Sequence, residues 1–139
     1  MQLNRAKLQQ KFSEAATQYD SHAQFQHVQT RRLLDSAVML LPAHARLLDI
    51  GCGTGYFAQE AKRVRPDWNI VGVDIAYGMC EVAKTRSAVL NADAANLPLA
   101  DASIDAVVSS LCYQWVDNQP QAFTELARVL IPNGRAMIA

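Results

Sequence analysis

The sequence has no excess of charge of either sign, since 13 Lys and Arg residues balance 13 Asp and Glu residues in a chain of 139. A neutral domain has no broad attraction for a phosphate backbone or an anionic lipid surface. The chain also lacks any apolar run near the roughly 20 residues that span a bilayer, and residues 1–10 lack the apolar segment of a signal peptide. We therefore expect a cytoplasmic protein that has neither nucleic acid nor a membrane as partner.

The sequence has few cysteines, and their spacing does not match a known disulfide or metal-binding motif. Cys52, Cys80 and Cys112 are odd in number, widely spaced and without a CxxC motif, so neither a disulfide framework nor a zinc site is indicated. The three histidines lack metal-ligand spacing as well, and we interpret them as surface or helix-face residues. No bound metal is expected.

The first part of the chain has a helical pattern. Leu34, Ala37, Val38 and Leu41 follow the i, i+3, i+4, i+7 spacing of a buried helix stripe, and a proline ends it. We expect residues 1–42 to form an N-terminal helical cap.

Short apolar runs alternate with helix-like segments in the rest of the chain. This order predicts an α/β fold with a Rossmann-like parallel sheet in three α/β/α layers, because strands that are apolar on both faces need helices on both sides. The sheet would occupy residues 43–139, within one structural domain overall. The expected strands are 46–50, 70–73, 88–90, 104–109 and a fifth that begins at 136 after a turn at 132–134.

The loop after the first strand carries Gly51, Gly53 and Gly55, preceded by Asp49. Glycines let a backbone turn tightly and approach a ligand without Cβ clashes. The following helix directs free N–H groups into the same space. Ligands of such sheets bind beyond the carboxyl ends of the strands, so this loop is a candidate binding element.

Asp74 ends the second strand. A carboxylate there can accept hydrogen bonds from both hydroxyls of a ribose, and the alternative is that it caps the next helix. The loop after the third strand places Asp93 before Ala94. A carboxylate beside a free backbone N–H can recognise the edge of an adenine, although a solvated loop aspartate would have the same sequence.

Together these loops are more specific. The runs LLDIGCGTG, VGVDIAYGM and LNADAANLPLADASIDAVVSS resemble class I S-adenosylmethionine-dependent methyltransferases, and ELARVLIPNG is similar to the helix and turn before that family's fifth strand. The resemblance covers roughly residues 45–139. It implies S-adenosylmethionine as the cofactor and S-adenosylhomocysteine as the product.

The resemblance also implies roles for individual residues. Gly51, Gly53 and Gly55 would line the methionine end of the donor with Asp49 behind them, and Asp74 would hold the ribose. The implied base-side and sulfonium-side contacts are Ile75, Met79, Asp93, Ala94 and Leu111.

A closer resemblance involves the N-terminal region. FSEAATQYDSHAQFQ and SSLCYQWVDN are similar to segments of the malonyl-[acyl-carrier protein] O-methyltransferases of biotin synthesis. In that comparison Tyr19 would fold over the donor, and Gln114 and Trp115 would lie at the mouth of the acceptor site. The implied acceptor is then a carboxylate on acyl-carrier protein, while quinone and other small-molecule methyltransferases share much of the pattern.

No general base is expected for a carboxylate acceptor. A carboxylic acid with a pKa near 4 is ionised at neutral pH, and no His or Lys follows the fourth strand. We identify no catalytic side chain, because the transfer depends on placing the acceptor in line with the donor methyl.

A nicotinamide-dependent oxidoreductase is the competing enzyme class. Asp74 suits its ribose equally well, but the loop spacing is GxGxG rather than GxGxxG. Asp93 also has no role in that alternative.

The resemblance implies seven strands for a complete domain, and the sequence provides five. We expect a shortened methyltransferase whose fifth strand exposes an edge, so that self-association is favoured. The non-enzymatic alternative is a domain that binds the donor but has no catalytic activity.

Overall fold

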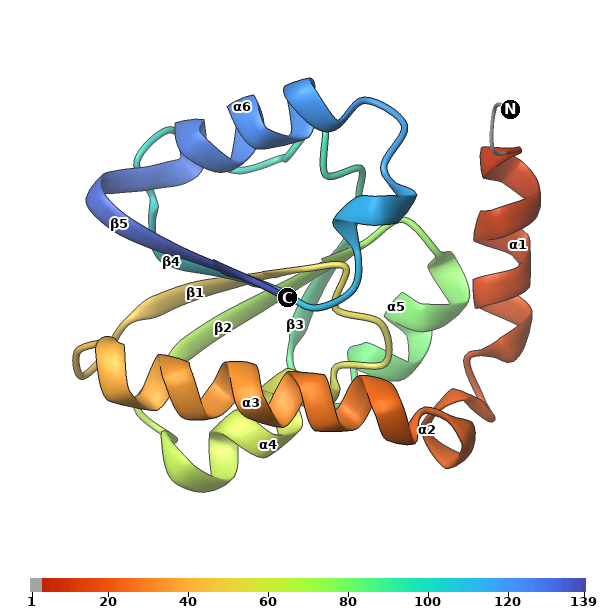
Figure 1. The fold of residues 1–139 in the computed structure, drawn as a ribbon, viewed down its shortest axis with the longest axis horizontal. Coiled ribbons are helices and arrows are strands. Elements are labelled where there is room, and N and C mark those ends of the chain that lie inside the picture. Colours follow the sequence, from red (N-terminus) through yellow and green to blue (C-terminus); the bar gives the residue numbers. More distant parts are fainter. Residues whose placement is uncertain (1–3) are drawn as a thin grey trace.

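A computed structural model describes residues 4–139, except for the side chains of Ser21 and His22. Helices and strands alternate along the chain after an N-terminal helical region, as Figure 1 shows. The elements are α1 (Arg5–Ala15), α2 (Tyr19–His22), α3 (Gln24–Leu40), β1 (Arg46–Ile50), α4 (Tyr56–Val64), β2 (Asn69–Asp74), α5 (Tyr77–Ala83), β3 (Ala88–Asn91), β4 (Ile104–Ser109), the 3₁₀ turn η1 (Tyr113–Trp115), α6 (Gln119–Val129) and β5 (Leu130–Ile138).

The strands form one parallel sheet in the order β3-β2-β1-β4-β5. The chain runs outward from β1 to β3, then returns to place β4 on the other side of β1. This reversal leaves a crevice outside the carboxyl ends of β1 and β4, where ligands of open α/β sheets bind. The predicted Rossmann-like class is confirmed.

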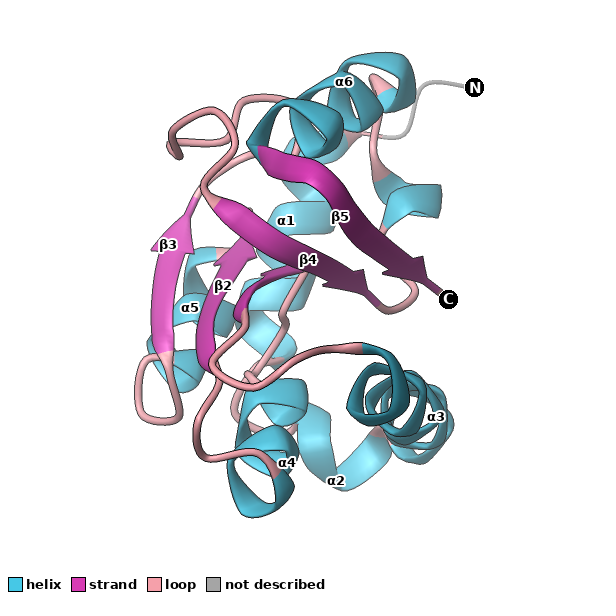
Figure 2. Cartoon of the chain, turned by 90° about the vertical axis from the view of Figure 1, so that its left-hand side faces the viewer, coloured by secondary structure: helices cyan, strands magenta, loops and turns pink. Residues whose placement is uncertain are grey.

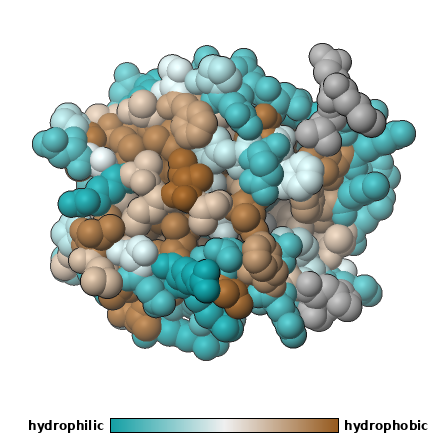
Figure 3. Space-filling model, viewed as in Figure 1, coloured by the Kyte–Doolittle hydropathy of each residue, from teal (hydrophilic) through white to brown (hydrophobic). Residues whose placement is uncertain are grey.

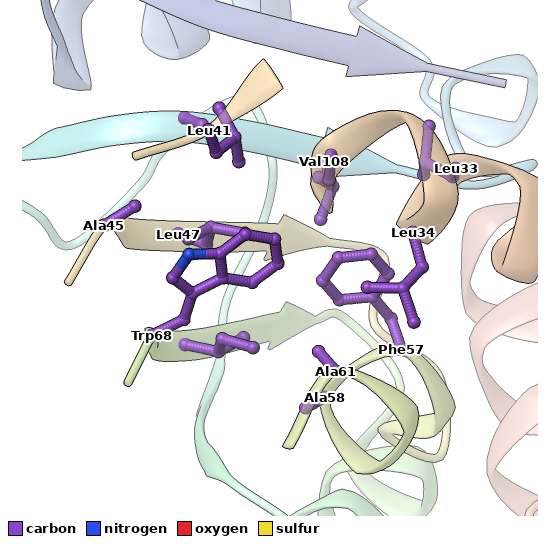
Figure 4. Close-up of a cluster of buried hydrophobic side chains, with 13 residues drawn as sticks. Leu33, Leu34, Leu41, Ala45, Leu47, Phe57, Ala58, Ala61, Trp68 and Val108 are labelled. Carbon is purple, nitrogen blue, oxygen red and sulfur yellow. The ribbon is translucent and has the colours of Figure 1, made fainter. Parts of the chain in front are cut away.

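Both faces of the sheet are covered, with α3 and α4 on one face and α6 on the other (Figures 1 and 2). Neighbouring strand residues point to opposite faces, so Leu47 packs in the cluster under α3 and α4 while Leu48 packs in the cluster under α6. Figure 4 shows Phe57 of α4 and Leu34 of α3 lying together, with Leu47 and Trp68 in the same buried cluster. Burial on both faces explains why apolar residues occupy most positions of β1, β2 and β4.

The N-terminal helices lie near the carboxyl ends of the strands (Figure 1). Asn4 caps α1 by accepting a hydrogen bond from the Lys7 backbone N–H. Farther along α1, Gln9 Nε2 donates to the Ile75 carbonyl at 2.6 Å, and Ser13 Oγ accepts from the Gly78 N–H at 3.1 Å. The polar side of α1 is thus bonded to the loop after β2 and to α5. That residues 1–42 form a separate cap remains a prediction.

The fifth strand is longer than predicted. β5 pairs with β4 from Leu130 onward, and the expected turn at 132–134 is a bulge within it, because the register moves from Ile104–Leu130 to Ala106–Arg135. Asn133 takes the left-handed backbone conformation of that bulge, with φ of 64°. Turn residues therefore interrupt the pairing without preceding the strand.

One edge of the sheet is β5, which pairs with β4 alone among the described residues. Apolar surface crosses the centre of the view in Figure 3, where Figure 1 places β5 between α3 and α6. Met39, Leu40 and Ile138 are exposed large apolar side chains on α3 and β5. No helix among residues 4–139 is both long and apolar enough to cross a membrane.

Candidate functional site

A cavity of about 790 Å³ lies at the carboxyl ends of the strands. Its walls come from the loops after β1, β2, β3 and β4 together with α1 and α3, and its volume is in the range of small-molecule sites. Every residue that the sequence singled out lines it except Gly55. The predicted residues that line it are Tyr19, Asp49, Gly51, Gly53, Asp74, Ile75, Met79, Asp93, Ala94, Leu111, Gln114 and Trp115.

The glycine loop leaves backbone open to the cavity. A Cβ at Gly53 would meet no atom within 4 Å, although φ of 55° would strain any other residue there. A Cβ at Gly51 would stand 2.4 Å from Cys112 Sγ, so this glycine lets the loops after β1 and β4 approach. The loop thus provides a surface for close contact with a ligand.

Gly55 differs from the sequence-based expectation. It is the N-cap of α4, and a Cβ on it would lie 3.3 Å from the Ala83 Cα. Its place is between the glycine loop and α5, not beside the cavity. The glycine pattern alone did not distinguish these positions, because tight helix packing and ligand approach both favour glycine.

Asp74 joins the first two loops. Its Oδ2 accepts a hydrogen bond from the Gly53 N–H at 2.9 Å, and its Oδ1 accepts one from the Ala76 N–H at 2.9 Å. Ala76, not Asp74, is the N-cap of α5. Burial raises the pKa of Asp74, while the backbone hydrogen bonds oppose that rise. The carboxylate is therefore rigidly held at the cavity wall.

Asp49 lies behind the glycine loop and is 4% exposed. Burial, and then the nearby Asp74 carboxylate, raise the pKa of Asp49 to about 7. The Asp49 and Asp74 carboxyl groups are therefore close enough to repel each other when both are ionised. A cation bound in the cavity would reduce this repulsion.

The loop after β3 presents Asp93 to the cavity. Its Oδ1 accepts from the Ala95 N–H at 2.9 Å, and its Oδ2 pairs with Arg5 of α1. Ala94 beside it is nearly buried. Met79 is also buried, against Ala16 and other apolar side chains from the helices. The Arg5 pairing is a feature that sequence reasoning missed.

The loop after β4 forms the opposite wall. Leu111 adopts a left-handed backbone, with φ of 53°. Trp115 is 43% exposed at the cavity wall, and its ring meets Phe12 of α1 edge to face at 6.4 Å. Tyr19 is half-buried, and burial followed by the charge of Asp74 raises its pKa.

A polar network beside the glycine loop was also missed. Asp20 accepts a hydrogen bond from Thr54 Oγ1 at 2.6 Å and forms an ion pair with Arg86 at 2.8 Å. Arg86 also donates to the Thr54 carbonyl at 3.0 Å. These links hold α2 against the glycine loop. Single polar residues so far apart in the chain carry no motif that could have shown this.

No group of His, Cys, Asp and Glu side chains within the described range is arranged to hold a metal ion. The cavity instead combines exposed glycine backbone, three carboxylates at the ends of successive strands and apolar walls. This set suits a nucleoside-bearing ligand with a cationic part.

Fold and cavity together define a Rossmann-like α/β domain of the methyltransferase kind. The chain belongs to the methyltransferase domain family, whose model matches residues 48–138.

Named relatives have specific activities. The chain is 42% identical over 145 residues to the biotin biosynthesis bifunctional protein BioHC of Cellvibrio japonicus, covering 99% of this chain and 28% of that protein. It is 38% identical over 130 residues to the malonyl-[acyl-carrier protein] O-methyltransferase of Xylella fastidiosa, covering 88% and 44%. The chain thus spans about half the length, or less, of these relatives.

Solved structures show the same fold. A SAM-dependent methyltransferase of Thermotoga maritima superposes with a TM-score of 0.73 at 31% identity, over 91% of this chain and 58% of that one. Phosphoethanolamine N-methyltransferase 2 of Haemonchus contortus, in complex with S-adenosylhomocysteine, gives a TM-score of 0.70 at 27% identity, over 78% and 27%.

Proposed function

We propose that the chain binds S-adenosylmethionine in this cavity and takes part in methyl transfer to a carboxylate. The observation that carries the proposal is the convergence of three consecutive crossover loops on one cavity, with Gly53, Asp74 and Asp93 all in its wall. Asp93 and Ala94 are suited to the adenine edge, and Asp74 to the ribose hydroxyls. The glycine loop then faces the amino-acid tail.

The donor, when bound, supplies a methyl group activated by the positive sulfonium. The chain's own task is to hold that group in place and exclude water. Asp49 and Asp74 provide the negative field that a sulfonium and an ammonium favour, and Leu111 provides an apolar wall. An acceptor atom then needs placement about 3 Å from the methyl, in line with the sulfur.

For the acceptor we propose the malonyl carboxylate on acyl-carrier protein, as in biotin synthesis, within the cytoplasm. The names of the relatives support this choice, and so does the exposed position of Gln114 and Trp115 at the cavity wall. A carboxylate needs no base because it is ionised at neutral pH. A quinone or another small molecule is the alternative acceptor, and donor binding without transfer is the alternative activity.

Two measurements test this function. Calorimetric titration with S-adenosylhomocysteine should give 1:1 binding, and titration with NAD should give none. Mass spectrometry should then detect a methyl ester on malonyl-acyl-carrier protein incubated with chain and donor, with acetyl-acyl-carrier protein as the control that lacks the carboxylate. Binding without methyl transfer to either acceptor would support a donor-binding domain, and binding of NAD alone would overturn the assignment.

A further inference from the structure

The cavity is unevenly charged. Its carboxylates are Asp49, Asp74, Asp93 and Asp117, whereas the basic side chains in its wall, within the described range, are Arg5 and His27. Arg5 is already paired with Asp93 at the loop after β3. His27 is therefore the basic group left for an anionic part of a ligand.

The His27 ring is held by two contacts. It stacks on the Tyr56 ring with centroids 3.7 Å apart and planes at 14°, and its Nε2 lies 3.4 Å from Asp20 Oδ1. The contact with Asp20 uses Nε2 and leaves Nδ1 as the second polar atom of the ring. The side chain is 17% exposed, so it is fixed in the wall yet open to the cavity.

The charge of Asp20 is largely taken up elsewhere. Its Oδ2 pairs with Arg86 at 2.8 Å, and its Oδ1 accepts the Thr54 hydroxyl at 2.6 Å. Asp20 and Arg86 together are neutral, so the carboxylate beside His27 does not add an uncompensated negative charge that would repel an anionic group of a ligand.

The backbone next to His27 favours an anion as well. Tyr56, on which His27 stacks, is the first residue of α4, and the N-cap Gly55 provides no side-chain hydrogen bond to the first turn. The free N–H groups of that turn carry the positive end of the helix dipole.

We propose that His27 binds the α-carboxylate of the donor's methionine portion, together with the first turn of α4. The proposal rests on the proposed function, which places adenine at Asp93 and ribose at Asp74. The amino-acid tail then crosses the glycine loop toward α4, where His27 lies. The sulfonium and ammonium are cations suited to Asp49 and Asp74, and the carboxylate is the ligand's one anion.

The test is a binding cycle with two ligands and three forms of the chain. The ligands are S-adenosylhomocysteine and its decarboxylated analogue, in which hydrogen replaces the α-carboxylate. The forms are the unaltered chain, His27→Gln and Arg31→Gln. Arg31 is the matched control, because its guanidinium lies over the same Tyr56 ring at 5.7 Å but does not line the cavity.

The unaltered chain and Arg31→Gln should prefer S-adenosylhomocysteine to the analogue by about 10- to 100-fold, the scale of one charged hydrogen bond. His27→Gln should lose most of that preference while binding the analogue as well as the unaltered chain does. Equal weakening of both ligands in His27→Gln, or an unchanged preference, would overturn the proposal. A His27→Lys variant that regains the preference separates a charge contact from loss of packing. Failure of the unaltered chain to bind either ligand would instead count against the proposed function itself.

Discussion

The backbone N–H of Gly53 donates a hydrogen bond to Oδ2 of Asp74 at 2.9 Å. This bond joins the loops after β1 and β2 at the cavity wall, so the carboxylate proposed to hold the ribose also fixes the glycine loop. A change at Asp74 should therefore affect the ligand and the loop together.

Asp74→Ala should weaken binding of S-adenosylhomocysteine by about 1–3 kcal/mol, because charged hydrogen bonds to the ligand and the loop are left unmade. Isothermal titration calorimetry measures the change. Asp35→Ala, which removes an exposed carboxylate on α3, is the control and should leave affinity unaltered. Unchanged affinity in Asp74→Ala would remove Asp74 from the site.

The unfolding free energy should fall as pH rises from about 4 to about 7. The pKa of Asp49 is raised from 3.8 to about 7 in the folded chain. Between these values the folded state keeps a proton that the unfolded state has lost, and stability then decreases with pH. Burial raises the pKa of Asp74 too, which adds to the same slope.

Asp49→Asn should flatten this pH profile and be more stable than the unaltered chain near pH 8, by at most about 4 kcal/mol at about 1.4 kcal/mol per pKa unit. Urea unfolding at several pH values measures it. A variant whose profile runs parallel to that of the unaltered chain would show that Asp49 is not the titrating group.

Gly53→Ala and Gly55→Ala should have different effects although both glycines have positive φ. The methyl at Gly53 enters the open cavity, so donor affinity should fall at least tenfold, about 1.4 kcal/mol, with a backbone cost of about 1–2 kcal/mol in stability. The methyl at Gly55 presses on Ala83 at 3.3 Å, so stability should fall by more than that. Thermal unfolding and calorimetric titration of both variants compare the two losses, and identical profiles would refute the distinction.

Trp115→Ala should raise the KM for a carrier-protein acceptor severalfold and leave the Kd of the donor within about twofold. The reason is that the exposed indole packs against Phe12 at the mouth of the cavity and not against the residues predicted to bind the donor. Steady-state kinetics and titration together separate the effects. A loss confined to donor affinity would assign Trp115 to the donor instead.

The chain should self-associate through β5. β5 pairs with β4 alone among residues 4–139, and exposed apolar side chains lie on α3 (Met39, Leu40) and on β5 (Ile138), a combination that favours pairing with another copy. Sedimentation velocity should show a concentration-dependent shift that Ile138→Lys reduces. A single monomeric species at all concentrations, with a cooperative melting transition, would contradict this.

The strands were predictable because buried strands of a parallel sheet appear in the sequence as short apolar runs. Most buried positions of β1 and β4 are apolar, Asp49 and Ser109 being the polar ones, and the predicted bounds of both strands agree with the structure. The fifth strand was predicted too, but its beginning at Leu130 was not, since Pro132 and Gly134 indicate a turn whether a strand starts after it or bulges there. Pairing across the sheet decided between them.

Some residues of the cavity wall could likewise be predicted from the sequence, and others could not. Asp74 and Asp93 could be found because parallel strands bring their carboxyl ends to one edge. Arg5 and His27 could not, because they lie on helices whose approach to the cavity depends on tertiary packing. Arg5 is 88 positions away from the Asp93 carboxylate that it meets.

A crystal structure of the chain with S-adenosylhomocysteine tests the central claim most directly. The account predicts the adenine edge against Asp93 and Ala94, the ribose hydroxyls on the Asp74 carboxylate, and the amino-acid tail over Gly51 and Gly53. A ligand bound elsewhere, or one whose ribose lies away from Asp74, would contradict it.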